Sequence, residues 1–244
     1  MTKAFEILGT PKEGQVLIVV DHASNHVPDK IDLGISHDFL GDHIAYDIGV
    51  AKIAALMTQG NSNIAILGGV SRLVVDLNRY PDEEKVIPAI SDGVHITGNQ
   101  ISQIERQKRL DEYFHPYHAE VKKLVSDLKP ALILALHSFT PTLRSNRNID
   151  RPWEIGVMYN YFETAAKLAV QYFEQEGLIA GDQKPYSGKE LNATMNRQAE
   201  AFNVPYTGVE IRQDLIGDAL GQKHFADILL RTCDKIRTGL ASGD

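Results

Sequence analysis

The sequence predicts an α/β fold in which a mainly parallel or mixed central sheet carries helices on both faces. Short, continuously apolar, β-branched runs, typical of strands buried on both faces, occur at 15–20 and 131–136. Between such runs lie long segments whose apolar residues recur at spacings of three and four, which is the pattern of helices. Strands that alternate with long helices favour a parallel sheet.

The elements are expected in a regular order along the chain. The strand at 15–20 ends in a polar cluster, and the strand at 131–136 lies between Pro130 and His137. Weaker β-forming runs predict strands at 63–67, 73–76, 155–159 and 207–211. Helical periodicity predicts helices over roughly 36–59, 99–128, 161–176 and 218–239. Because no linker, repeat or low-complexity stretch interrupts this order, we expect a single domain over 1–244.

Composition and charge exclude several classes of protein. The chain of 244 residues has 25 Lys and Arg against 32 Asp and Glu, a formal net charge of −7. This balance argues against a nucleic-acid coat or a polybasic membrane binder, because both need a positive field. No run approaches the roughly 18 apolar residues of a membrane span, and the N-terminus lacks the apolar stretch of a signal peptide. We therefore expect a cytoplasmic protein that binds neither nucleic acid nor membrane.

Histidines and carboxylates must hold any metal ion. Cys233 is the only cysteine, so neither an internal disulfide nor a thiolate zinc cage is possible. His22 and His137 each follow a predicted strand, and ligands of open α/β sheets bind at the carboxyl ends of the strands. Either histidine alone is more often a hydrogen-bonded structural residue. Two histidines at equivalent strand ends favour a shared site.

Glu210 lies inside the apolar run 207–211, where an ionised carboxylate must be paired, protonated or beside a metal. Alternation places Glu210, Arg212 and Asp214 on one face of this strand, so a structural ion network is one interpretation. The functional interpretation makes Glu210 a general base whose pKa is tuned by burial and a nearby cation, and which acts on a water bound to a metal ion.

The segment 71–80 presents groups suited to an anion. Arg72, Asn78 and Arg79 supply two guanidiniums and an amide, and the planar guanidinium fork matches two oxygens of a carboxylate or a developing oxyanion. The alternatives are that Arg79 pairs with Asp76 and that Arg72 is a surface residue.

Several motifs, taken together, resemble a known family. Asp76-Leu-Asn-Arg79 resembles a signature of aspartoacylases and succinylglutamate desuccinylases, whereas the segments that begin at His137 and Glu210 resemble parts of zinc carboxypeptidases. The N-formylglutamate amidohydrolase family is similar over a wider set of segments, 21–28, 46–49, 71–79, 117–118 and 137–138. The combination is specific, whereas each single motif is not.

The resemblance implies a zinc-carboxypeptidase-like hydrolase that cleaves the amide between a formyl or other small acyl group and an acidic amino acid. Zn²⁺, held by three protein ligands, is expected to activate water. Glu210 then moves a proton to the leaving amine, and Arg72 stabilises the oxyanion. The expected substrate-binding residues are Asn78, Arg79, Asn25, Ser138 and Arg212, with Asn78 and Arg79 on the α-carboxylate.

The identity of the third metal ligand, beside His22 and His137, stays open. Carboxypeptidases supply their first two ligands as His-x-x-Glu, but Asn25 follows His22 at plus three, and an amide is a poor zinc ligand. Asp47 is the preferred candidate because it lies on the predicted helix after the first strand. His43 shares its helical face and is the other residue that could reach the site. Asp47 as a solvated charge and Asn25 as a turn residue or substrate contact are the alternatives.

Other functions and residues are kept open. The chain is alternatively a non-catalytic carboxylate-binding protein, or a zinc hydrolase of another small amide, ester or peptide. A serine nucleophile is disfavoured because neither Ser24 nor Ser138 lies in a Gly-x-Ser-x-Gly turn. Tyr186 is a candidate to close over substrate. A cluster of arginines after His137 supplies local positive charge that could steer a dianionic substrate: Arg144, Arg147 and Arg151. The alternative is that the cluster is an ordinary basic loop.

Overall fold

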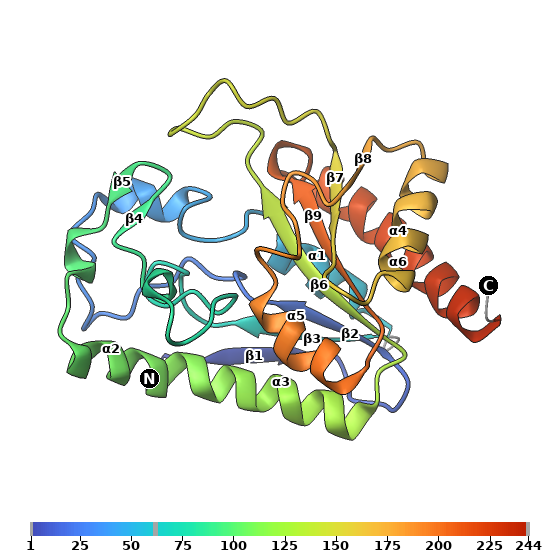
Figure 1. Cartoon of the computed structure of the whole chain (residues 1–244), viewed down its shortest axis with the longest axis horizontal. Coiled ribbons are helices and arrows are strands. Elements are labelled where there is room, and N and C mark those ends of the chain that lie inside the picture. Colours follow the sequence, from blue (N-terminus) through green and yellow to red (C-terminus); the bar gives the residue numbers. More distant parts are fainter. Residues whose placement is uncertain (1, 61–62, 243–244) are drawn as a thin grey trace.

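A seven-stranded mixed sheet forms the centre of the computed structural model, which describes residues 2–60 and 63–242 (Figure 1). The strand order is β1-β3-β2-β6-β9-β7-β8. Four adjacent strands are parallel: β3 (Asn63–Gly68), β2 (Val16–Val20), β6 (Leu132–Phe139) and β9 (Tyr206–Arg212). The predicted α/β class with a mainly parallel or mixed sheet is therefore confirmed. The ends of the predicted domain, 1 and 243–244, lie outside the described residues.

The outer strands of the sheet are short. Antiparallel pairing joins β1 (Phe5–Leu8) to β3 and β7 (Ile155–Met158) to β9, and β8 (Ala180–Asp182) runs parallel to β7. A separate two-stranded hairpin consists of β4 (Ile90–Ser91) and β5 (Val94–His95). Four of these strands, β1, β4, β5 and β8, were not predicted from the sequence. The two or three residues of β4, β5 and β8 are too few for an apolar or alternating pattern, and β1 is not buried, so it lacks the apolar run of a buried strand.

Helices cover both faces of the sheet and bury its central strands completely. On one face, α1 (Val50–Met57), α4 (Thr164–Gln175) and α6 (Ala219–Ser242) pack together; α3 (His115–Leu128) and α5 (Ala193–Gln198) pack together on the other (Figure 1). Every residue of β2, β3 and β6 is buried, which explains the apolar runs at 16–20, 64–67 and 132–136. In the described part of the chain, no helix is both long and apolar enough to cross a membrane.

The predicted helix over 99–128 forms with one irregularity. Ser102 accepts the Glu105 N–H and begins α2 (Gln103–Arg109). A π-helical turn (Leu110–Phe114) joins α2 to α3, and Lys129, in the left-handed region, follows the end of α3. The helices predicted at 161–176 and 218–239 correspond to α4 and α6. Short 3-10 turns lie at Glu84–Val86, Thr97–Asn99, Glu200–Phe202 and Gln213–Leu215.

The predicted helix over 36–59 is wrong in its middle. A 3-10 turn (His37–Gly41) and α1 form, but turns occupy 42–49. Gly49 has φ 87°, and a Cβ there would lie 2.5 Å from the Ile216 carbonyl oxygen, so the chain turns sharply before α1. The Asp47 N–H donates to the His22 carbonyl at 2.9 Å instead of to a helical partner. Asp47 and His43 therefore do not share a helical face.

The strand predicted at 73–76 is also wrong. The N–H groups of Val74 and Val75 both donate to the Ser71 carbonyl, and the Ser71 hydroxyl accepts the N–H of Leu73. The segment is therefore a compact turn. Its apolar residues are buried by packing against the rest of the core, so burial of a turn produced the apolar run that resembled a strand.

The parallel strands bring three chemically reactive segments to one edge of the sheet. His22 follows β2, His137 lies in β6, and Glu210 lies in β9. The strands β2, β6 and β9 are neighbours, and His137 is directly opposite Glu210 in the β6–β9 register. Their carboxyl ends point the same way, so the three side chains meet at that edge.

Candidate functional site

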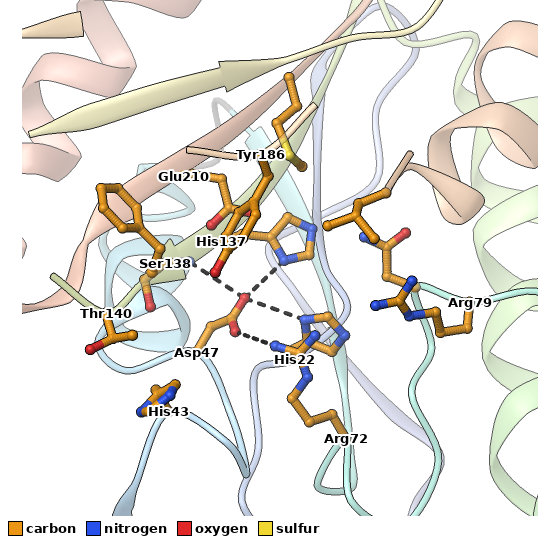
Figure 2. A pocket seen from close by; sticks show the side chains of 14 residues that line it. His22, His43, Asp47, Arg72, Arg79, His137, Ser138, Thr140, Tyr186 and Glu210 are labelled. Carbon is orange, nitrogen blue, oxygen red and sulfur yellow. Dashed lines mark hydrogen bonds and ion pairs between the residues drawn. The ribbon is translucent and has the colours of Figure 1, made fainter. Parts of the chain in front are cut away.

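A cleft opens at the carboxyl edge of β2, β6 and β9 (Figure 2). Its volume of ≈ 160 Å³ is smaller than the roughly 300–1,000 Å³ of pockets for drug-sized ligands, so it suits a small molecule. Most of the predicted site residues line it: His22, Asp47, Arg72, Asn78, Arg79, His137, Ser138 and Glu210.

His22, Asp47 and His137 form a buried cluster at the floor of the cleft. The Oδ2 atom of Asp47 lies 2.8 Å from Nδ1 of His137 and 3.4 Å from Nδ1 of His22. One possible ligand atom from each residue lies within 4.8 Å of the others. Two imidazole nitrogens and one carboxylate oxygen are a donor set that zinc accepts, with a position left for water or substrate. The structure thus brings together the three residues that the sequence analysis proposed as metal ligands.

The other two candidates for the third ligand lie apart from this cluster. His43 lines the cleft, but its Nε2 atom is 3.0 Å from Asp92, and its other ring nitrogen contacts Asp42. Asn25 is exposed, and its amide donates to the Leu40 carbonyl at 2.8 Å. Asp47 is therefore the candidate that the geometry favours.

Two further carboxylates face the outer nitrogens of the histidines. Nε2 of His22 lies 2.8 Å from Asp76, and Nε2 of His137 lies 3.8 Å from Oδ2 of Asp21. The other Asp21 oxygen accepts a hydrogen bond from the Tyr117 hydroxyl at 2.7 Å, whereas no described residue forms a hydrogen bond with the buried Oδ2 of Asp21. Carboxylates in this position fix the tautomer and orientation of metal-binding histidines. The sequence analysis missed this role of Asp21 and Asp76, although Asp21 directly precedes His22.

The electrostatics of the cluster favour a bound cation. Burial lowers the pKa of His22, and Arg72 opposes its protonation, but Asp76 and Asp47 outweigh both and raise that pKa to about 9. Burial opposes ionisation of Asp47, yet His22 and His137 hold the pKa of Asp47 well below its usual range. Asp47 is thus ionised at neutral pH and, with Asp76, holds a proton on His22, and it also raises the pKa of His137. A divalent ion that replaces protons on these imidazoles satisfies the same charges.

Glu210 is buried beside the cluster with a free oxygen. Burial raises its pKa to about 7, and its Oε2 atom has no hydrogen-bond partner among the residues that the structure describes. The predicted ion network with Arg212 and Asp214 does not include it: Arg212 donates to Asp214 at 2.8 Å and to the Pro152 carbonyl at 3.3 Å, outside the residues that line the cleft. A half-titrated carboxylate with an unused oxygen is suited to proton transfer near neutral pH.

Cationic and amide groups line the cleft around Glu210. Arg72 donates to Asp47 and to Asp76, each at 3.2 Å. Arg79 has only long contacts, 3.9 Å to Asp76 and 3.9 Å to Glu83, so the predicted pairing with Asp76 is weak. The Oδ1 atom of Asn78 accepts the Thr194 N–H at 3.0 Å.

Other candidates from the sequence have structural partners. The Ser138 hydroxyl, at the cleft wall, donates to the Ile48 carbonyl at 3.0 Å. His118, which belongs to the segment 117–118 that resembles the family, is buried, and its ring contacts the Leu77 carbonyl at 2.9 Å. Burial lowers the pKa of His118 to about 4, so it is a neutral packing residue. Arg144 pairs with Asp42 near the surface.

The chain is similar to known proteins in sequence and in fold. Residues 14–217 match the model of the N-formylglutamate amidohydrolase family. The structure is similar to that of a gene product from Agrobacterium tumefaciens, with a TM-score of 0.91 and 28% identity over 98% of this chain and 96% of that one. It also has the fold of an N-formylglutamate amidohydrolase from Ralstonia eutropha, with a TM-score of 0.74 and 16% identity over 98% of this chain and 100% of that one. The search of curated proteins returned no match.

Proposed function

Since the chain belongs to the N-formylglutamate amidohydrolase family of amide-cleaving hydrolases, we propose that it hydrolyses N-formyl-L-glutamate or a similar N-acyl acidic amino acid with the help of a divalent metal ion. One observation carries this proposal. The buried carboxyl group of Glu210, with a free oxygen, lies at the same strand edge as the cluster of His22, Asp47 and His137.

The cluster fits a metal ion such as Zn²⁺. His22, Asp47 and His137 supply nitrogen and oxygen donors, while Asp76 and Asp21 face the outer imidazole nitrogens. Nε2 of His137 lies 3.8 Å from the buried Asp21 oxygen that lacks a hydrogen-bond partner among the described residues, so Asp21 would help to orient this ring if His137 held an ion. A zinc ion held there supplies a Lewis acid that lowers the pKa of water towards neutrality and polarises a carbonyl group.

Glu210 moves the proton in the proposed reaction. Its ionised carboxylate accepts a proton on Oε2 from the attacking water, whose oxygen forms a bond to the acyl carbon. Glu210 then donates this proton to the amide nitrogen, and the carbon–nitrogen bond breaks. For N-formyl-L-glutamate the products are formate and glutamate.

Arg72, Asn78 and Arg79 stabilise and orient the substrate. Two carboxylates hold the guanidinium of Arg72 in place before substrate binds, so it stabilises the oxyanion without reorganisation. The long contacts of Arg79 leave its fork available for the α-carboxylate. Asn78, oriented by its bond to the Thr194 N–H, presents its amide to the same group.

Hydrolysis of N-formyl-L-glutamate by chelator-treated and metal-restored enzyme tests the proposed function. We expect formate release after zinc, cobalt or manganese is added, and its loss after chelation, because water needs activation by the ion. Absence of hydrolysis with all three metals would contradict the proposal. A carboxylate ligand that binds equally well with and without chelator, and is never cleaved, would support the non-catalytic alternative.

The rate is expected to depend on the ionisation of Glu210. Burial raises the pKa of Glu210 to about 7, and only the ionised form accepts a proton. We therefore expect kcat/KM to fall as the pH decreases below about 7. Above about pH 7 this ionisation is complete and no longer changes kcat/KM. A pH–rate profile from about pH 5 to about pH 9 measures this midpoint. A rate that stays constant down to the acidic end would show that Glu210 is not the essential base.

A further inference from the structure

Arg151 is a buried cation without a counter-ion at the edge of the cleft. Arg151 is 7% exposed, and its buried Nε atom finds no hydrogen-bond partner in the described part of the chain. Within residues 2–60 and 63–242, no carboxylate lies within ion-pair distance of its guanidinium. A buried, uncompensated charge is costly, so this position needs an anion that the protein does not provide.

Arg151 is held directly behind the wall of the cleft. Its Nη1 atom donates to the Thr140 carbonyl at 3.0 Å and to the Tyr186 hydroxyl at 3.1 Å. The guanidinium centre lies 5.0 Å from the centre of the Tyr186 ring. Thr140 and Tyr186 line the cleft, and Figure 2 shows the Tyr186 ring reaching into it. The positive charge of Arg151 therefore acts on the cleft through Tyr186.

The hydroxyl of Tyr186 has a proton to donate. It accepts a hydrogen bond from Arg151, and a phenolic hydroxyl both accepts and donates. In the described part of the chain, no group accepts the Tyr186 proton. Burial raises the pKa of Tyr186, so the hydroxyl stays protonated. Its natural partner is an acceptor atom of a molecule in the cleft.

We propose that Tyr186 and Arg151 bind the side-chain carboxylate of the substrate. Tyr186 donates its hydroxyl proton to that carboxylate, and Arg151 positions the hydroxyl and supplies the positive charge. The proposal rests on the function proposed above, in which Arg79 and Asn78 hold the α-carboxylate. Arg72 is already paired with two carboxylates, so Arg79 and Arg151 are the cations that match a dianion. The pair therefore selects an acidic side chain over its neutral amide.

Binding of L-glutamate and L-glutamine to the zinc-loaded enzyme tests the pair by calorimetry. The two ligands share their α-carboxylate and differ at the side-chain terminus, so the ratio of their affinities isolates that end. We expect the wild-type protein to prefer glutamate. Tyr186→Phe and Arg151→Met are each expected to weaken glutamate binding about tenfold and leave glutamine within about twofold, because a hydrogen bond to a charged group is lost.

Arg147→Met is the matched control. Arg147 is an exposed arginine of the same loop, so its loss removes one charge without touching the cleft and is expected to leave the ratio unchanged. Three results would rule out the proposed role of Tyr186 and Arg151. These are equal binding of both ligands by the wild type, a parallel loss of affinity for both ligands in Tyr186→Phe and Arg151→Met, or an unchanged affinity of these two variants for glutamate. Because binding needs no turnover, this result is separate from the hydrolysis assay, whose failure bears on the proposed function.

Discussion

Replacing Glu210 with glutamine is expected to lower kcat for N-formyl-L-glutamate by about 10³-fold, within the range for loss of a general base. Glutamine keeps the shape of the side chain but accepts no proton, so water loses its base and the leaving amine its acid. Zinc content is expected to stay that of the wild type, because Glu210 lies outside the cluster of His22, Asp47 and His137. Steady-state kinetics and metal analysis of the same preparation measure both quantities.

Asp214→Asn is the matched control for this variant. Asp214 is a carboxylate just beyond β9 that pairs with Arg212 away from the cleft, so its loss is expected to leave kcat nearly unchanged.

Ionising Glu210 destabilises the fold as the pH rises from about 4.5 to about 7, because the pKa of Glu210 is higher in the folded than in the unfolded protein. Above about pH 7, the melting temperature of Glu210→Gln is therefore expected to be no lower than that of the wild type. If Glu210→Gln keeps a tenth or more of the wild-type kcat, Glu210 is not the general base.

Asp47→Asn is expected to weaken zinc affinity more than about 100-fold. Changes in groups that only orient metal ligands typically cost 10–100-fold, and loss of a direct ligand costs more. The amide keeps the size of the side chain but replaces the anionic oxygen that lies between His22 and His137. Competition with a chromogenic chelator measures the affinity, and we expect activity to be lost in proportion at limiting zinc.

His43→Gln and Asn25→Ala are the comparison variants for Asp47. Both residues were alternatives for the third ligand, and both lie apart from the cluster with partners of their own. We expect each to retain zinc affinity within about threefold, below the change for an orienting group. If either variant loses more zinc affinity than Asp47→Asn, the ligand set of His22, Asp47 and His137 is wrong.

The central strands were predictable because their signal is local. Complete burial on both faces makes β2 and the first five residues of β6, 132–136, continuously apolar, and this feature is readable in a window of a few residues. An apolar run also predicted a strand at 73–76, and this prediction was wrong because the run belongs to a buried turn. The segment 42–49 has helical spacing, but Gly49 and the bond between Asp47 and the His22 backbone hold it in turns.

Contiguous motifs and local periodicity established the α/β class and the family, and they placed His22, His137 and Glu210 at strand ends. These features depend on neighbours in the chain, which a sequence displays directly. The sequence also indicated Asp47 as the preferred third ligand, but on the expectation of a helix that does not form. The choice of Asp47 over His43 and Asn25, the outer carboxylates and the contact of Arg151 with Tyr186 were decided only by the folded chain. Asp47 meets His137 across 90 positions, and Arg151 meets Tyr186 across 35. Such contacts are made by turns without periodicity, so only the packing of the whole molecule decides which side chains meet.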